Sequence, residues 1–138
     1  MRQNPRNAKA LNYLGYTYAE RGVKLKEAES MIKQALELEP DNNAFMDSLG
    51  WVYYQMGNLE LAVKHLERAA ELSPPDGLIC EHLADAYMRA KQPAKALALY
   101  QKALALYRSA EEKTKDNEAG LRRVQDKIAT LNQSLNKP

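Results

Sequence analysis

The sequence predicts an all-α protein built from repeated pairs of helices. Three segments resemble one another: LNYLGYTYAERG at 11–22, MDSLGWVYYQMG at 46–57 and CEHLADAYMRAK at 80–91. A second series follows them: EAESMIKQALELEP at 27–40, LAVKHLERAAELSP at 61–74 and KALALYQKALALYR at 95–108. Both series recur at steps of 34 or 35 residues. A fixed period in this range is typical of stacked helical repeats.

The first series forms one amphipathic helix in each copy. Its shared face follows the spacing i, i+3, i+4, i+7. The residues on that face are Leu11, Leu14, Gly15 and Tyr18, then Met46, Leu49, Gly50 and Tyr53, then Cys80, Leu83, Ala84 and Tyr87. Glycine or alanine in the third position lets two helix backbones approach closely, while leucine and tyrosine fill the space beside them. Each copy is therefore expected to cross a partner helix at this position.

The second series supplies that partner helix. Its apolar face carries Ala28, Ile32 and Ala35, then Ala62, Leu66 and Ala69, then Ala96, Tyr100 and Ala103. Gly22 and Gly57 suit the end of the first helix of a pair, where a left-handed residue is needed. Pro40 and Pro74 end the second helix because proline cannot continue it, and the polar residues beside them can begin the next helix.

A helix-turn-helix unit of about 34 residues with this pattern resembles the tetratricopeptide repeat family. The match covers residues 8–108, and the second copy carries the family positions Leu49, Gly50, Tyr53, Gly57, Ala62, Leu66, Ala69 and Pro74. The third copy departs from the pattern, with Ala84 for glycine, Lys91 at the turn and Arg108 for proline. The resemblance implies a right-handed superhelix of three helix-turn-helix pairs, at 8–40, 43–74 and 77–108.

The C-terminal segment 117–135 is predicted to form one more helix, with an apolar stripe on an otherwise charged surface. The stripe consists of Leu121, Val124, Ile128, Leu131 and Leu135. Stacked repeats leave the last apolar face bare, and a terminal helix with a polar outer side covers it. We therefore expect a C-terminal capping helix; the alternative is that the stripe pairs with another molecule. Because Arg108 replaces a proline, the preceding helix can also extend into the polar stretch SAEEKTKDN.

The resemblance also implies a concave groove lined by the first helix of each pair, which binds extended peptides or partner helices in this family. The residues expected to face it are Asn12, Tyr16 and Glu20 in the first copy, Asp47, Trp51, Tyr54 and Gln55 in the second, and Glu81, Asp85, Met88 and Arg89 in the third. This aromatic and mildly acidic surface suits a partner segment with apolar side chains and a Lys or Arg. For Trp51 the alternative is packing against the neighbouring repeat.

One known use of the family is not expected here. In that use, a clamp of lysines, an arginine and asparagines holds the terminal carboxylate of chaperone tails. The corresponding positions in this sequence are Asn12, Tyr16, Ser48, Leu78 and His82, and none of them matches. The sequence therefore predicts a binding scaffold that does not hold such a carboxylate.

Composition and motifs indicate a protein without chemistry of its own. The chain contains 45% hydrophobic and 28% charged residues, a composition typical of globular proteins. Its net charge of +2 does not indicate a surface that binds nucleic acid. No glycine-rich phosphate loop, metalloprotease helix or nucleophile elbow is present. Cys80 falls on the core face while His82 points roughly 200° round the helix, so they cannot share a metal ion. We expect no enzyme activity, no cofactor and no metal site.

The expected function is protein or peptide binding by a monomer. The alternative is a structural module that forms homo-oligomers through its C-terminal helix or its repeat ends. No apolar run reaches the roughly 18 residues of a membrane span, so this segment is expected to make no membrane contact.

The N-terminal residues Asn4-Pro5-Arg6-Asn7 resemble the end of a preceding repeat, which indicates a piece of a longer array. The stretch DSLGWVYY and the longer first turn also resemble repeats of bacterial exported lipoproteins of this family. A fragment of such a protein would come from the periplasm or outer membrane; otherwise the cytoplasm is expected.

Overall fold

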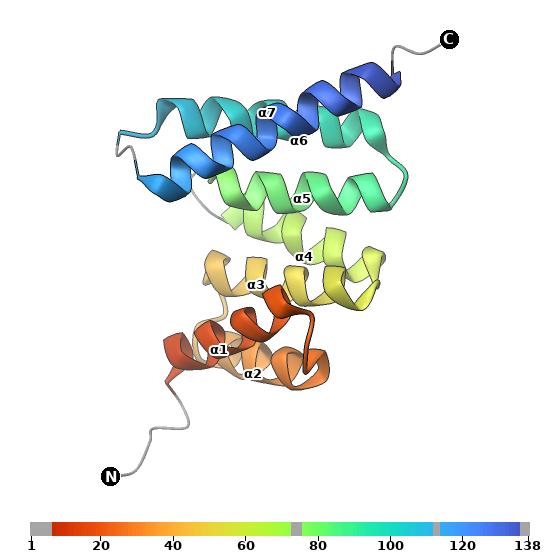
Figure 1. Cartoon of the computed structure of the whole chain (residues 1–138). Helices are drawn as coiled ribbons and strands as arrows, with labels where there is room; N and C mark the ends of the chain where they lie inside the picture. Colours follow the sequence, from red (N-terminus) through yellow and green to blue (C-terminus); the bar gives the residue numbers. More distant parts are fainter. Residues whose placement is uncertain (1–6, 73–75, 112–113, 136–138) are drawn as a thin grey trace. The chain divides into compact units, whose positions relative to one another are not determined.

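The computed structural model describes residues 7–72, 76–111 and 114–135, and the chain divides into two compact units (Figure 1). The first unit, Met1–Ser73, contains α1 (Ala8–Arg21), α2 (Leu25–Leu38), α3 (Asn43–Met56) and α4 (Leu59–Leu72). The second, Pro74–Pro138, contains α5 (Gly77–Arg89), α6 (Pro93–Ser109) and α7 (Lys115–Leu135). The described residues contain no strand. Pro5 and Pro74, to which the sequence assigns repeat ends, lie outside the described residues.

The first helix of each pair begins with a polar side chain that caps it. The Asn7 side chain accepts a hydrogen bond from Ala10 N at 3.0 Å, and the Asn42 side chain accepts one from Phe45 N at 3.0 Å. Asp76 caps α5 in the same way. Such caps satisfy backbone N–H groups that have no partner within the helix. They explain why α1, α3 and α5 start where they do.

The same three helices end in one type of turn, although only two of them end in glycine. Gly22 and Gly57 adopt φ of 66° and 83°, in the left-handed region. The third copy has Lys91 there, with φ of 62°. The N–H of the following residue, Gln92, donates to Tyr87 O at 2.9 Å, which is the bond that closes this turn. The third pair therefore keeps the turn geometry and places a lysine in a conformation that favours glycine.

Glycine marks the crossing point of each pair in the first unit. A Cβ added at Gly15 would lie 2.7 Å from Ile32 Cγ1, and one added at Gly50 would lie 2.6 Å from Leu66 Cγ. Ile32 and Leu66 are fully buried at these crossings. The predicted close approach of α1 to α2 and of α3 to α4 is confirmed, and no larger residue fits without displacing a core side chain.

Phe45 of α3 fills the seam between the two pairs of the first unit, packing with Ala8 and Ala35. By contrast, Leu14, which the sequence places on the core face of α1, is 40% exposed. That expectation was wrong because the face is buried only where another helix packs on it, and α1 contacts α2 and α3 alone among the described helices.

In the second unit α7 packs on α6 and, to a smaller extent, on α5 (Figure 1). Val124 and Leu131 of the predicted stripe are buried, and Gly120 lies so close to Tyr107 that an added Cβ would be 2.5 Å from Tyr107 Cζ. Leu135, at the end of α7, is 45% exposed and does not share in this burial. α7 thus covers the last pair, as expected of a capping helix, while α6 ends at Ser109, the first residue of the polar stretch.

Candidate interaction surface

In the first unit the predicted groove residues lie on two adjacent helices. α1 carries Asn12, Tyr16 and Glu20, and α3 carries Asp47, Trp51, Tyr54 and Gln55. α1 and α3 pack against each other. A hydrogen bond links the two rows directly, since Gln55 Nε2 donates to Ala19 O at 2.8 Å. Gln55 is therefore part of the joint between the helices, and its amide is already engaged.

Trp51 and Tyr54 form a stacked pair. Their ring centroids are 4.4 Å apart with an interplanar angle of 6°. Both side chains are half-buried, so the pair keeps part of its surface open to solvent. Rings one helical turn apart are natural neighbours, and stacking restricts their rotamers. The result is a rigid aromatic platform on α3. Tyr53 of the same helix is buried and does not belong to this platform.

Polar groups flank the α1 and α3 rows. Tyr16 OH donates to Glu20 Oε2 at 3.4 Å, and Glu20 is exposed. The Oδ1 atom of Asn12 is buried and has no hydrogen-bond partner among the described residues. Asp47 is buried, contrary to the expectation that it faces an open groove. Its carboxylate contributes no exposed charge to this surface.

The predicted groove residues of α5 divide between the interior of the second unit and its surface. Met88 and Arg89 are exposed, whereas Glu81 is only 2% exposed and Asp85 is half-buried. Both acids are covered by α7, from which Lys127 Nζ reaches Glu81 Oε2 and Asp85 Oδ1 at 3.0 Å each. Glu81 and Asp85 therefore hold the terminal helix and are not open to a partner.

An acid–base cluster of six side chains joins α5, α6 and α7, and consists of Glu81, Asp85, Tyr100, Tyr107, Arg123 and Lys127. Arg123 binds Glu81 through Nε at 2.8 Å and Nη2 at 2.9 Å, and Tyr107 OH donates to Glu81 Oε1 at 2.9 Å. The Tyr100 hydroxyl donates to Asp85. A forked arginine–carboxylate pair fixes orientation as well as charge.

The charges of the cluster are set by these contacts. Burial raises the pKa of the Glu81 carboxyl, but hydrogen bonds from Arg123 and Lys127 outweigh burial and hold its pKa at about 2. Burial alone would lower the pKa of Lys127, yet the nearby charge of Asp85 and the bond to Glu81 raise it above its ordinary value. Burial raises the pKa of the Tyr107 hydroxyl. At neutral pH Glu81 is therefore ionised and Lys127 protonated, as an ion pair requires.

Sequence reasoning missed the basic half of this cluster. Arg123 and Lys127 are one turn apart and flank the apolar Val124. That spacing is a signal that both point toward one neighbouring helix. It could not identify α5 as that neighbour, because spacing within one helix carries no information about which helix it meets.

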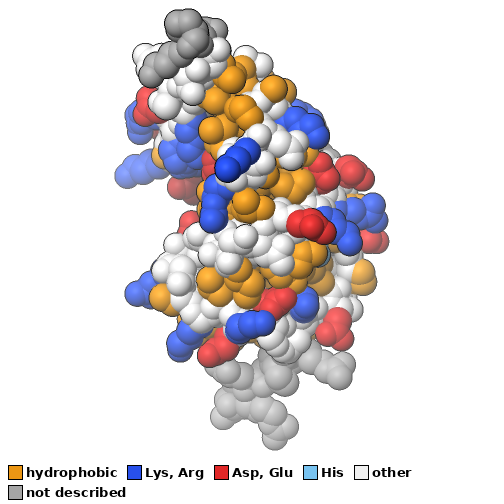
Figure 2. Space-filling view, turned by 90° about the vertical axis from the view of Figure 1, so that its right-hand side faces the viewer, with side chains coloured by type: hydrophobic (Ala, Val, Ile, Leu, Met, Phe, Trp, Pro, Cys, Tyr) orange, Lys and Arg blue, Asp and Glu red, His pale blue; other side chains and the backbone are white. Residues whose placement is uncertain are grey.

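The described residues do not gather potential metal ligands in one place. Among them no group of three or more His, Cys, Asp or Glu is placed to hold a metal ion. Cys80 and His82 are both buried, and burial raises the pKa of the Cys80 thiol. None of the helices described combines the length and the apolar composition that crossing a bilayer would need. Figure 2 shows hydrophobic side chains in patches between groups of both charges, with no face of a single sign in that view.

Comparison with known proteins gives one relative of similar sequence. The TPR repeat-containing protein PA4667 of Pseudomonas aeruginosa is 41% identical over 83 residues, which are 60% of this chain and 14% of that protein. The chain therefore matches only a small part of this relative's length.

Two solved structures show the same fold at lower identity. PcrH in complex with the chaperone binding region of PopD superposes with a TM-score of 0.81 at 16% identity, over 97% of each chain. The first TPR of Spaghetti (RPAP3), bound to the HSP90 peptide SRMEEVD, gives 0.67 at 18% identity, over 91% of this chain and 96% of that one. The predicted fold class, all-α with helix pairs of the tetratricopeptide type, is confirmed. Residues 3–133 match the family described as "Psidin, N-terminal TPR repeats region", and the chain belongs to this family of tetratricopeptide repeats.

Proposed function

We propose that this chain is a non-catalytic scaffold that binds a peptide or partner helix on the first helices of its pairs. The observation that carries the proposal is the Trp51–Tyr54 stack, a rigid and half-open aromatic pair on α3 beside α1. Tryptophan and tyrosine are enriched among the few residues that carry most of the binding energy in protein interfaces. Both PcrH and RPAP3, which share the fold, were solved with a bound segment of another protein.

The groups around the stack indicate the chemistry of the partner. The aromatic faces suit apolar side chains and the cation of a Lys or Arg, and the neighbouring helix α1 carries the exposed carboxylate of Glu20. The proposed partner is therefore an apolar segment with a basic residue.

We propose further that this surface does not bind chaperone-tail carboxylates. At the clamp positions Asn12 and Tyr16 carry no positive charge, and Leu78 cannot form a hydrogen bond through its side chain. Ser48 and His82 are buried, and the Ser48 hydroxyl donates to Ala44 O at 3.1 Å. The chain therefore lacks the row of cations that a carboxylate clamp needs, although RPAP3 shares its fold and binds an HSP90 peptide.

The alternative function is self-assembly through the C-terminal helix. It would use the repeat ends or the apolar stripe of α7. Within that stripe Val124 and Leu131 are buried in the chain, Leu121 and Ile128 are half-buried, and Leu135 is exposed. This remaining apolar surface is small compared with the roughly 1,000 Å² that a stable interface buries. We expect light scattering to give a constant monomer mass over a wide concentration range; a mass that rises with concentration would favour self-assembly.

A displayed library of random peptides tests the binding function. Peptides enriched on the wild-type chain are synthesised, and their affinities are measured by fluorescence polarisation against the wild type and the double variant Trp51→Ala, Tyr54→Ala. Either ring is expected to be a hot spot worth about 2 kcal/mol or more, and the losses from two residues in contact need not add. Affinity for the double variant should therefore fall at least about 30-fold. Tyr13→Ala is the matched control, since Tyr13 is 75% exposed on α1 and lies outside the predicted surface.

The control should bind like the wild type, and circular dichroism should show that all variants are folded. If the double variant binds the enriched peptides as tightly as the control does, the aromatic pair is not the binding surface. If no peptide is enriched on the wild type, the scaffold proposal itself loses its support.

A further inference from the structure

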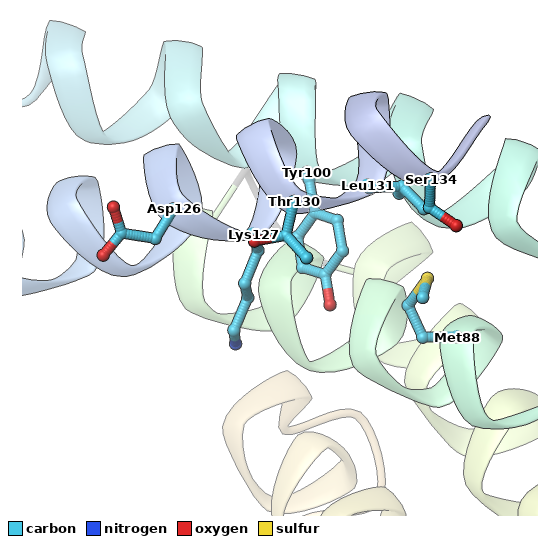
Figure 3. A pocket seen from close by; sticks show the side chains of 7 residues that line it. All are labelled: Met88, Tyr100, Asp126, Lys127, Thr130, Leu131 and Ser134. Carbon is cyan, nitrogen blue, oxygen red and sulfur yellow. The ribbon is translucent and has the colours of Figure 1, made fainter. Parts of the chain in front are cut away.

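An open pocket of about 360 Å³ lies in the second unit, between α5, α6 and α7 (Figure 3). Met88 of α5 and Leu131 of α7 lie on two sides of it, and the ring of Tyr100 of α6 lies beside them near Thr130. Asp126 and Thr130, both exposed on α7, border it. The volume is at the lower end of the range for ligand sites in proteins, and the mainly apolar lining fits an aliphatic side chain of a partner better than a cofactor.

The walls combine a fixed part with an adaptable part. The Tyr100 hydroxyl donates to Asp85, and Lys127 Nζ lies 3.0 Å from Asp85 Oδ1 and 5.6 Å from the centre of the Tyr100 ring. These contacts hold the ring in place before anything binds, which lowers the ordering cost of binding. Met88 is 39% exposed, and its flexible thioether can adjust to the shape of an apolar group.

The pocket has an uncompensated negative charge at its border. Lys127 lines the pocket, but its ammonium group is already bound by Glu81 and Asp85. No ion pair to Asp126 is present among the residues that the structure describes. The free carboxylate of Asp126 lies at the end of the pocket away from Met88 (Figure 3), where it complements a cation that follows an apolar group.

We propose that this pocket is a specific subsite for a partner peptide, which inserts a leucine-sized aliphatic side chain between Met88 and Leu131 and places an adjacent Lys or Arg against Asp126. The proposal rests on the proposed role as a binding scaffold and assigns one site and one sequence preference to it. The site belongs to the second unit alone and uses none of the aromatic residues of α3. It can therefore fail while the scaffold function stands.

Three capped hexapeptides test the subsite on the full chain: Ser-Gly-Leu-Arg-Gly-Ser, the same peptide with Arg→Glu, and the same peptide with Leu→Ser. Methyl NMR of Met88 and Leu131 and the indole N–H signal of Trp51 report where each peptide binds. The Leu-Arg peptide should shift the two methyl signals in a saturable way. Arg→Glu should weaken binding about two- to fivefold, as for an exposed ion pair, and Leu→Ser about tenfold or more.

Two pairs of variants separate the charge from the cavity. Asp126→Lys should reverse the preference, so that the Leu-Glu peptide binds more tightly than the Leu-Arg peptide. Glu118→Lys makes the same charge change at an exposed site of α7 outside the pocket and should keep the original preference. Thr130→Trp should fill the pocket and abolish the methyl shifts, whereas Ala129→Trp, at the exposed neighbouring position, should not.

The proposal is overturned if the three peptides shift the Met88 and Leu131 methyls equally, or if none of them does. Shifts confined to Trp51 would also overturn it, while leaving the scaffold function in place. If the Trp51–Tyr54 surface selects no peptide but the Met88 and Leu131 methyls shift as predicted, the aromatic site is wrong and the pocket subsite stands.

Discussion

Arg123 of α7 binds Glu81 of α5 with both branches of a fork, Nε to Oε2 at 2.8 Å and Nη2 to Oε1 at 2.9 Å. The Glu81 side chain is 3% exposed, so its charge depends on these contacts in place of water. Lys127 and Tyr107 bind the same carboxylate. The terminal helix is thus held over α5 by a buried anion as well as by its apolar stripe.

Arg123→Ala is expected to lower the free energy of unfolding by about 2 kcal/mol, because it removes two charge-assisted hydrogen bonds from a buried carboxylate. Arg122→Ala is the matched control, since Arg122 is exposed on the same helix and should cost no more than about 0.5 kcal/mol. Urea unfolding followed by circular dichroism measures both. Equal losses in the two variants would show that the Glu81 pair contributes nothing specific.

The same pair predicts how stability depends on pH. The pKa of Glu81 is lowered from 4.5 to about 2 in the folded chain. The Glu81 carboxylate therefore contributes fully to stability above its pKa in the unfolded chain. This contribution is lost as pH falls through its pKa in the folded chain. Between neutral pH and about pH 3 the loss should be on the order of 2 kcal/mol.

Glu81→Gln isolates this contribution. At neutral pH the variant should have a lower free energy of unfolding than the wild type. The difference between the two should become smaller as pH falls below 4.5. Glu118→Gln, at an exposed position of α7, should unfold like the wild type throughout. A gap between Glu81→Gln and the wild type that stays constant down to about pH 2 would contradict the assignment of the shift to Glu81.

Replacing Gly120 by alanine should change the free energy of unfolding in the direction opposite to the one that helix propensity predicts. At an exposed position inside a helix, glycine to alanine stabilises by up to about 1 kcal/mol. Here the new Cβ would lie 2.5 Å from Tyr107 Cζ, so Gly120→Ala should destabilise by about 1 to 3 kcal/mol through overpacking.

A double-mutant cycle with Tyr107→Ala tests the cause of that loss. Without the ring the clash disappears, and Gly120→Ala should then be neutral or stabilising relative to Tyr107→Ala alone. Thermal unfolding of the four chains gives the coupling energy. Additive losses would mean that Gly120 is required for a reason other than the tyrosine.

The fold was predictable wherever a residue's role depends on its own helix or its pair. The crossing of Gly50 with Leu66 was predictable because glycine is unfavourable inside a helix and is tolerated there where another group approaches the backbone closely. The exposure of Leu14 and the burial of Glu81 depend instead on which further helix packs on α1 or α5. A helical wheel gives the direction of a side chain and says nothing about what it meets there. Trp51 and Tyr54 were predicted as surface aromatics, but their stacking on each other depends on rotamers that the sequence does not specify.

Replacing Lys91 by glycine tests whether the left-handed backbone of this turn is strained in the third pair, where the first two pairs have glycine. The Lys91 φ of 62° matches the left-handed conformation of Gly22 and Gly57 at the equivalent turns. In this conformation a residue with a side chain is about 1 to 2 kcal/mol less favourable than glycine. Part of the difference is offset because glycine loses more conformational freedom on folding. Lys91→Gly should therefore raise the free energy of unfolding by about 0.5 to 1 kcal/mol.

The control for this substitution is Ala90→Gly, one residue earlier, where φ is −81° and glycine has no advantage. That variant should be destabilised or unchanged, and the reverse change Gly57→Lys should cost about 1 kcal/mol in the first unit. Chemical denaturation of the three variants compares them directly. If Lys91→Gly and Ala90→Gly shift stability in the same direction, the turn at Lys91 is not strained, and the sequence departure of the third copy has no energetic consequence.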